Sequence, residues 1–344
     1  MKVVVTGGLG YIGSHVAILL LELGHDVIIA DNFSNSSPAV LKRIESITKK
    51  NPTFEALDLK KQIDVKTLFS IHKHIDGIIH FAALKAVGES VEQPLRYYEN
   101  NLHSLIYLLE EVVLQSIPLI FSSSCTVYGE PDAVPIAESA PLKATISPYG
   151  ATKQMAETII QDVCVANPTF NAVLLRYFNP IGAHPSAQIG EIPQGVPANL
   201  VPYLTQTAIG KREQLKVFGA DYPTPDGSCI RDYIHVMDLA QAHINSLEFL
   251  WNKKQETNCE VFNIGTGKGY SVLELIKTFQ EATGQQVNYS LTERRPGDIM
   301  QAYANPQKAE AILGWKAQYS LAEALSSAWE WEKRWQQEQS SNNE

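Results

Sequence analysis

Three side chains in this sequence could together move a proton and hold a reacting oxygen: Ser124, Tyr149 and Lys153. Tyr149 and Lys153 stand at positions i and i+4, so a helix would place both on one face. A nearby ammonium favours the phenolate, which predicts a lowered pKa for Tyr149 and a role as proton acceptor. Ser124 follows a predicted strand, and its hydroxyl could bridge the same oxygen. Because a Tyr/Lys pair alone is common on helix surfaces, the prediction depends on the surrounding motifs.

A glycine-rich turn near the start of the sequence predicts a dinucleotide site. Gly7, Gly10 and Gly13 recur at every third position, between a predicted strand and a predicted helix. Such glycines let the backbone turn tightly and approach a pyrophosphate at the helix N-terminus. Asp31 ends the next predicted strand, where a carboxylate would bind the adenosine ribose and repel a 2′-phosphate. The pattern therefore favours NAD over NADP as the cofactor.

The elements that must position these residues follow from the periodicity of the chain. Short β-branched runs alternate with amphipathic stretches through the first half, which predicts an α/β fold with a doubly wound parallel sheet of the Rossmann type. The expected strands cover residues 2–6, 26–30, 53–57, 77–81, 119–123 and 172–177. The expected helices cover residues 12–23, 38–49, 65–72, 94–114 and 147–166.

The second half has a different texture, with long loops rich in glycine and proline that are typical of ligand binding. Helices are expected over residues 233–249, 272–282, 306–313 and 321–336, and a short strand over 261–264. We expect an NAD-binding domain over residues 1–178, to which residues 231–264 return, a smaller mixed α/β substrate lobe over 179–230 and 265–336, and a frayed polar tail over 337–344.

Composition limits the class of partner. Of the 344 residues, 44% are hydrophobic and 19% are charged, as in an ordinary globular protein with a sizeable core. The net charge of −9 argues against non-specific binding to nucleic acid or to an anionic membrane. Four scattered cysteines without metal-ligand spacing, a start without a signal-peptide pattern and no long apolar run predict a cytoplasmic protein with reduced thiols, no metal and a small-molecule partner.

With these motifs, the sequence resembles the extended short-chain dehydrogenases/reductases and, within them, most closely the UDP-glucose 4-epimerase family. The resemblance runs from residue 1 to about residue 330, and its most specific stretches are residues 84–90 and 231–240. Further matching segments are residues 5–15, 24–27, 31–32, 80–82, 121–129, 147–150, 174–180 and 294–298.

The resemblance implies an NAD-dependent enzyme that interconverts UDP-glucose and UDP-galactose by reversible oxidation at C4′ through a 4-keto sugar. Tyr149 would be the base, Lys153 would hold the nicotinamide ribose, and Ser124 would hydrogen-bond the reacting oxygen. The other cofactor contacts that it implies are Tyr11 and Ile12 at the pyrophosphate, Asn32, Asn35 and Ser36 at the adenosine ribose, Asp58 and Leu59 at the adenine, and Phe81, Lys85, Asn100 and Phe178 around the nicotinamide.

For the UDP-hexose, the resemblance implies contacts with residues of the second half: Asn179, Asn199, Leu200, Lys216, Val217, Phe218, Arg231, Tyr233, Arg294 and Asp298. It also implies a homodimer formed through helices 94–114 and 147–166. Ala302 falls at the family's gate beside the sugar 2-position, with Tyr303 one residue away as the other possible alignment. A small residue at this gate leads us to hypothesise that N-acetylated UDP-sugars (UDP-GlcNAc and UDP-GalNAc) are accepted as well.

Three other interpretations stay open at this point. A nucleotide-sugar 4,6-dehydratase needs an acid and a base just past Ser124, where this sequence has Cys125 and Thr126, which cannot protonate a leaving hydroxyl well at neutral pH. A UDP-glucuronate 4-epimerase differs only by a carboxylate in its substrate. A non-catalytic NAD sensor on the same fold would be expected to lack Tyr149 or Lys153.

Overall fold

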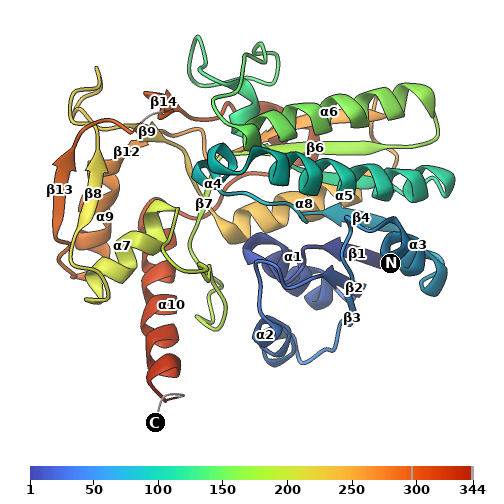
Figure 1. Ribbon diagram of the computed structural model, residues 1–344, viewed down its shortest axis with the longest axis horizontal. Coiled ribbons are helices and arrows are strands. Elements are labelled where there is room, and N and C mark those ends of the chain that lie inside the picture. The colour runs from blue at the N-terminus through green and yellow to red at the C-terminus, as the bar shows by residue number, and fades with distance from the viewer. Residues whose placement is uncertain (296, 342–344) are drawn as a thin grey trace.

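The computed structural model describes residues 1–295 and 297–341. Its larger part is a parallel sheet of seven strands in the order β11-β6-β5-β4-β1-β2-β3 (Figure 1). The strands are β1 (Lys2–Thr6), β2 (Asp26–Asp31), β3 (Thr53–Ala56), β4 (Gly77–His80), β5 (Leu119–Ser124), β6 (Ala172–Tyr177) and β11 (Cys259–Ile264). The predicted doubly wound α/β fold is thereby confirmed.

Helices cover both faces of this sheet because its strands are apolar on both sides. Val3 and Val5 of β1 pack in one core layer, whereas Val4 packs in the opposite layer. The first layer is covered by α1 (Tyr11–Glu22), α2 (Pro38–Thr48) and α8 (Val236–Trp251). The second is covered by α3 (Gln62–Ile71), α5 (Pro94–Leu114) and α6 (Pro148–Ala166), with the short α4 (Val87–Glu92) beside α5 and α6.

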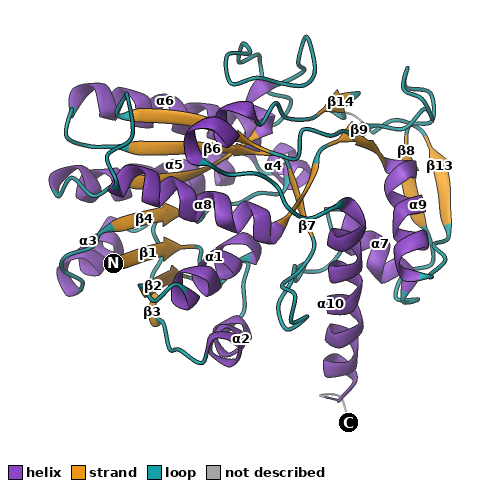
Figure 2. Cartoon of the chain, turned by 180° about the vertical axis from the view of Figure 1, so that it is seen from behind, coloured by secondary structure: helices purple, strands orange, loops and turns teal. Residues whose placement is uncertain are grey.

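Most of the remaining elements form a smaller lobe beside the carboxyl edge of the sheet (Figure 2). Its own core packs Leu204, Phe279, Leu325 and Trp329 together. The helices of the lobe are α7 (Leu200–Ala208), α9 (Val272–Thr283) and α10 (Leu321–Ser341). The short strands are β8 (Leu215–Phe218) with β13 (Tyr289–Thr292), and β12 (Tyr270–Ser271) with β9 (Ile230–Arg231) and β14 (Gln301–Ala302). Between sheet and lobe, β7 (Asn179–Ile181) pairs with β10 (Tyr233–His235).

Several elements differ from the sequence prediction. The helix expected from residue 233 begins at Val236, because residues 233–235 pair with β7 as β10. The stretch expected as a helix over 306–313 contains a π-helix, η2 (Ala309–Leu313). α10 continues to Ser341 instead of fraying at 337, while residues 342–344 of the expected tail lie outside the described residues.

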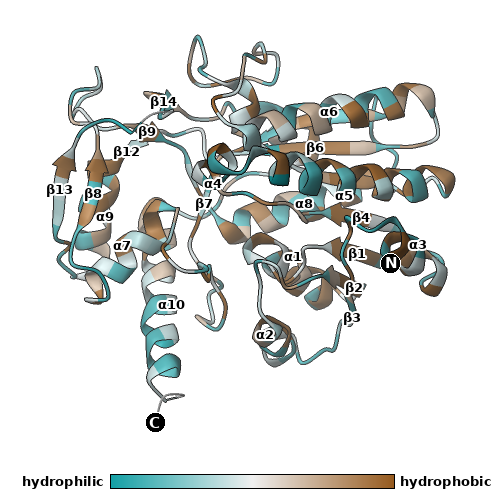
Figure 3. Cartoon of the chain, viewed as in Figure 1, coloured by the Kyte–Doolittle hydropathy of each residue, from teal (hydrophilic) through white to brown (hydrophobic). Residues whose placement is uncertain are grey.

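The extended end of α10 is held by the first half of the chain. Arg43 of α2 packs its guanidinium over the rings of Trp331 and Trp335, at 5.1 and 5.3 Å from their centroids, and forms an ion pair with Glu338. Figure 3 shows α10 becoming hydrophilic toward its C-terminus, while the sheet strands are hydrophobic. Among the described residues, no helix is long and apolar enough to cross a membrane.

Candidate active site

The candidate cofactor residues gather at one edge of the sheet, because parallel strands all end on the same side. Tyr149 and Lys153 lie on α6 and Asn100 lies on α5. The others end or follow successive strands: Gly7, Gly10, Tyr11, Ile12 and Gly13 after β1, Asp31, Asn32, Asn35 and Ser36 at β2, Asp58 and Leu59 after β3, Phe81 and Lys85 after β4, Ser124 at the end of β5 and Phe178 after β6.

The glycine loop after β1 forms a cradle lined by backbone. A Cβ on Gly7 would lie 2.8 Å from the backbone nitrogen of Ala82, and Gly7 has a φ of +65°. A Cβ on Gly13 would lie 2.5 Å from the carbonyl oxygen of Gly7. Gly10 is the N-cap of α1, whose first turn carries no acidic side chain. The N-terminus of α1 is thus lined by backbone and carries no negative side chain. This arrangement fits the pyrophosphate of a dinucleotide.

Asp31 joins the glycine loop to the loop that follows β2. Its carboxylate accepts hydrogen bonds from the backbone N–H of Leu9 at 3.1 Å and of Phe33 at 2.9 Å. It also accepts one from the hydroxyl of Ser36 at 2.8 Å. The same carboxylate thus orders both loops that would surround an adenosine ribose, and its oxygens keep further acceptor capacity for ribose hydroxyls.

Ser124, Tyr149 and Lys153 are fixed by the ends of β5 and α6. Ser147 caps α6 by accepting a hydrogen bond from the N–H of Gly150 at 3.2 Å, which places Tyr149 in the first turn and Lys153 in the next. Lys153 Nζ donates to the carbonyl oxygen of Ser122 at 2.6 Å. Ser124 Oγ accepts from both the N–H and the hydroxyl of Thr126, at 3.2 and 3.0 Å, so its own proton is left to donate elsewhere.

The expected lowering of the tyrosine pKa is wrong for this structure. Burial raises the pKa of Tyr149, and a hydrogen bond with Ser124 opposes that shift only in part. Lys153 Nζ lies 6.0 Å from the centroid of the Tyr149 ring, and burial lowers the pKa of Lys153 to about 8. Burial therefore governs the pKa of Tyr149, and a phenolate here needs additional positive charge.

The loop after β4 links the candidate nicotinamide residues to α6. Asn101 holds this loop by accepting from the N–H of Leu84 at 2.8 Å and donating to the hydroxyl of Thr152 at 3.0 Å. Asn100, the predicted contact, donates to the side chain of Asn101 at 2.9 Å. Asn101 was not predicted, and an amide in the middle of an apolar helix face was the signal that could have found it.

Strand pairing brings some of the candidate substrate residues together. Asn179 stands opposite Tyr233 across β7 and β10, and Arg231 stands opposite Ala302 across β9 and β14. Arg231 also lies beside the turn after β5, since its charge lowers the pKa of the Cys125 thiol while burial raises that pKa to about 12. Arg231 and Ala302 therefore belong to the neighbourhood of Ser124, and Cys125 stays protonated near neutral pH.

The nucleotide side of the site is more open. Arg294 donates from Nε to Asp221 at 2.8 Å and stacks over Tyr222, so part of its hydrogen-bonding capacity is already used. Arg295 pairs with Asp298 at 2.7 Å. Lys216, Val217 and Phe218 lie on β8, Asn199 and Leu200 begin α7, and Pro296 of the 294–298 motif lies outside the described residues.

Ala302 faces the candidate nicotinamide residues. It belongs to one buried cluster with Val127 and Phe178, beside the turn that follows Ser124. Tyr303 packs elsewhere, because a Cβ on Gly269 would lie 2.8 Å from its ring. Of the two possible alignments, Ala302 is thus the residue that packs in the cluster with Phe178, and Tyr303 is the one that does not.

Comparisons with known proteins agree with this geometry. A family model described as GDP-mannose 4,6 dehydratase matches residues 4–328. The UDP-glucose 4-epimerase of Yersinia enterocolitica is 50% identical over 334 residues, which are 97% of this chain and 98% of the relative. That of Bacillus subtilis (strain 168) is 49% identical over 333 residues, 96% of this chain and 97% of the relative. The chain belongs to the UDP-glucose 4-epimerase family.

A solved structure of the same family shares the fold. The UDP-glucose 4-epimerase from Bifidobacterium longum, in complex with NAD+ and UDP, superimposes with a TM-score of 0.92 at 46% identity, covering 97% of this chain and 98% of that one. The predicted recognition of the UDP-glucose 4-epimerase family is thereby confirmed.

In this epimerase-family chain, two buried polar groups near the site escaped the sequence prediction. Arg176 of β6 forms a buried ion pair with Glu157 of α6, with Nη2 and Oε2 2.6 Å apart. Asp232 accepts from the N–H groups of Thr266, Gly267 and Ala304 at 2.9, 3.1 and 3.1 Å, and so joins β9 and β10 to the loops that follow β11 and β14. For Arg176 the signal was a charged residue inside the apolar pattern of β6, whereas Asp232 lies between β9 and β10 and had no such signal.

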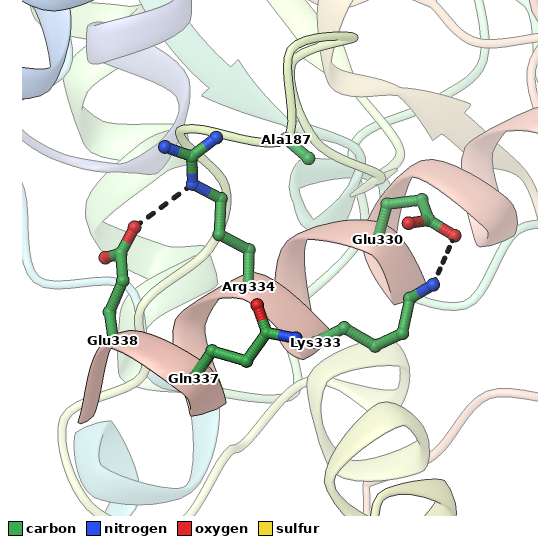
Figure 4. A pocket seen from close by; sticks show the side chains of 6 residues that line it. All are labelled: Ala187, Glu330, Lys333, Arg334, Gln337 and Glu338. Atoms are coloured by element: carbon green, nitrogen blue, oxygen red, sulfur yellow. Dashed lines mark hydrogen bonds and ion pairs between the residues drawn. The ribbon is translucent and has the colours of Figure 1, made fainter. Parts of the chain in front are cut away.

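A depression on the outer side of α10 lies apart from the epimerase-family site (Figure 4). It is lined by Ala187, Glu330, Lys333, Arg334, Gln337 and Glu338. In Figure 4 the carboxylates of Glu330 and Glu338 point to Lys333 and Arg334 of the same helix. Charges that neutralise one another on a single solvated helix offer no unpaired group to a ligand, so this depression is not a candidate site.

Proposed function

We propose that this chain is an NAD-dependent epimerase that interconverts UDP-glucose and UDP-galactose by reversible oxidation at C4′ through a 4-keto sugar. The observation that carries the proposal is the placement of Tyr149, Lys153 and Ser124 at the carboxyl edge of the sheet that also carries the glycine cradle. The identity of 46–50% to UDP-glucose 4-epimerases over nearly the whole chain supports it.

Each member of this trio has a task that its surroundings suit. Tyr149 is the base that takes the proton of the 4′-hydroxyl and later returns it. Ser124 donates to the same oxygen, since Thr126 occupies only its acceptor positions. Lys153, fixed on the carbonyl of Ser122, holds the nicotinamide ribose and keeps a positive charge near the phenol.

The glycine cradle, Asp31 and the loop after β4 are the residues that would hold NAD. When bound, NAD supplies the hydride acceptor and a positively charged ring at this edge. That charge is the addition that the buried Tyr149 needs, because burial raises its pKa in the chain alone. Proton abstraction by Tyr149 is therefore expected to depend on the presence of the oxidised cofactor.

The alternatives fit this site less well. Elimination of water in a 4,6-dehydratase needs an acid and a base past Ser124, but burial raises the pKa of Cys125 to about 12 and the Thr126 hydroxyl donates to Ser124. A sensor without activity would not need the full trio of Ser124, Tyr149 and Lys153. A UDP-glucuronate 4-epimerase stays an alternative. Its substrate carries an extra carboxylate, which the protein would need a group to bind.

The substrate range is proposed to include the N-acetylated UDP-sugars. Ala302 is buried in the cluster that contains Phe178, and its methyl group fills little space beside the proposed position of the sugar. A larger side chain there would occupy the room that an N-acetyl group requires.

We propose that the protein is a cytoplasmic homodimer formed through α5 and α6. The two helices pack side by side on the outer side of the sheet (Figure 1). Leu95 and Ile106 of α5 and Met155 of α6 are apolar and exposed, and a second copy packed on these helices would bury them. Sedimentation of the purified protein tests the dimer, and a monomer would contradict it.

The decisive test of function needs one substrate and no additions. The purified protein is incubated with UDP-galactose without added NAD, and the products are separated by chromatography. We expect UDP-glucose to appear, because the cofactor is retained and regenerated in each cycle. If no UDP-glucose forms even after NAD is supplied, the proposed function is wrong.

A further inference from the structure

Residues 182–191 form a hairpin that lies between the glycine cradle and the lobe. Its two ends meet in an antiparallel bridge between Ala183 and Gly190. On one side the hydroxyl of Tyr11 donates to the carbonyl oxygen of Gly182 at 2.6 Å. On the other side the N–H of Ala183 donates to Ser327 of α10 at 3.0 Å. The base of this hairpin is thus tied both to the cofactor cradle and to the lobe.

The outer part of the hairpin is fixed by α2 and α10. Arg43 donates to the carbonyl oxygen of Gln188 at 2.8 Å, and Trp331 Nε1 donates to that of Glu191 at 3.0 Å. Trp331 packs so closely on Gly190 that a Cβ there would lie 2.5 Å from its ring. The backbone that carries Glu191 is therefore rigidly placed with respect to both halves of the molecule.

The side chain of Glu191 points to one residue from each proposed binding site. A single oxygen, Oε1, accepts hydrogen bonds from Lys85 Nζ at 2.8 Å and from Asn199 Nδ2 at 2.7 Å. Lys85 comes from the loop after β4 and Asn199 from the start of α7. Only 12% of the Glu191 side chain is exposed, whereas 47% of the Lys85 side chain is, so the carboxylate is buried and the ammonium reaches the solvent-facing side of the site. None of the sequence motifs contained Glu191.

We propose that Glu191 is a positioning residue that couples the cofactor site to the nucleotide-sugar site by orienting Lys85 and Asn199 before the ligands bind. The inference rests on the proposed function, since Lys85 and Asn199 are assigned to ligands there. A free lysine side chain loses many rotamers when it binds a ligand, and an ion pair that fixes it beforehand removes that entropic cost.

Opposite charges explain how a carboxylate is tolerated beside two anionic ligands. The ammonium of Lys85 neutralises Glu191, so the pair as a whole does not repel a phosphate. The opposite role, in which Glu191 competes with phosphates for Lys85, is the outcome that the test must exclude. The two roles predict opposite changes in ligand affinity when the charge of Glu191 is removed. Binding becomes weaker in the first case and tighter in the second.

The test is Glu191→Gln, which keeps the size of the side chain and removes its charge. We expect the KM for UDP-galactose to rise about tenfold, as for the loss of one hydrogen bond to a charged group, with kcat changed less than about threefold. Less NAD should stay bound through gel filtration, and the melting temperature should stay near that of the unchanged protein. Glu281→Gln, which alters an exposed ion pair on α9, is the matched control and should leave every readout unchanged.

Asn199→Ala distinguishes coupling from a general loss of structure. If Glu191 acts in part through Asn199, the two substitutions remove part of the same interaction. The double variant should then lose less UDP-binding free energy than the two single variants lose together. A KM that stays the same or falls in Glu191→Gln would overturn the proposal. If the unchanged protein does not convert UDP-galactose, the proposed function fails, and calorimetric binding of UDP to both forms still tests the role of Glu191.

Discussion

The proposed proton-transfer centre and the proposed nucleotide end of the site are held in different ways. Ser124, Tyr149 and Lys153 are 7%, 8% and 4% exposed, and they are fixed by a strand end, a helix cap and a buried carbonyl. Arg294 and Arg295 have side chains that are 46% and 55% exposed and are held by surface ion pairs. Residues whose chemistry needs sub-ångström placement lie on regular elements. Residues that attract phosphates lie in exposed loops.

This contrast also has an electrostatic side. At the centre, burial sets the pKa values: it raises that of Tyr149 and lowers that of Lys153 to about 8. At the nucleotide end, solvent screens the charges, and exposed ion pairs of this kind contribute little to stability. Substitutions at the centre should therefore change the rate or the stability strongly, and those at the other end should change mainly KM.

The largest expected effect is on the base. Tyr149→Phe removes the proposed base for the 4′-hydroxyl proton, and we expect kcat to fall by about 10²- to 10⁴-fold, the usual contribution of a general base. NAD should stay bound, because the cradle and Asp31 are untouched. Tyr289→Phe, on β13 of the lobe, is the matched control. Activity retained in Tyr149→Phe would mean that another group is the base.

The next largest effect concerns the scaffold beneath the centre. Glu157→Leu leaves Arg176 buried without its carboxylate partner, and breaking a buried pair in this way costs about 3–5 kcal/mol in free energy of unfolding. Denaturant unfolding measures it. Glu330→Leu breaks an exposed pair on α10 and should change stability far less. Equal losses in the two variants would contradict the contrast between the buried and the exposed region.

A smaller effect is expected at the gate. Ala302→Tyr fills the space beside Phe178, so we expect the kcat/KM for UDP-GalNAc to fall at least about tenfold while that for UDP-galactose changes less. Turnover of both substrates by both forms measures this. If the unchanged protein does not convert UDP-GalNAc at all, the proposal that N-acetylated sugars are accepted is wrong, whatever the variant does.

The sequence predicted the elements around Tyr149 far better than those of the lobe, and the reason is physical. The helix that carries Tyr149 is long and has a regular period, so α6 (Pro148–Ala166) nearly matches the expected range of 147–166. Some strands of the lobe, such as β9 and β14, have only two residues each. They are too short to show a periodic pattern in the sequence. Glu191 was missed because one of its partners, Lys85, lies 106 residues away in the sequence, and nothing local marks a residue that joins it to Asn199.

The smallest effect is on the pH dependence of stability. Burial lowers the pKa of His243 to about 4, against about 6.5 in the unfolded chain, so between these values the unfolded state binds the extra proton. The free energy of unfolding therefore falls as the pH drops below 6.5. His243→Leu removes one proton-binding group, so it should reduce the slope of this free energy against pH by about 1.4 kcal/mol per pH unit. Denaturant unfolding from pH 4.5 to 8 measures both slopes. Above pH 7 the two forms should run parallel, and parallel curves below pH 6.5 as well would show that His243 is not the group responsible.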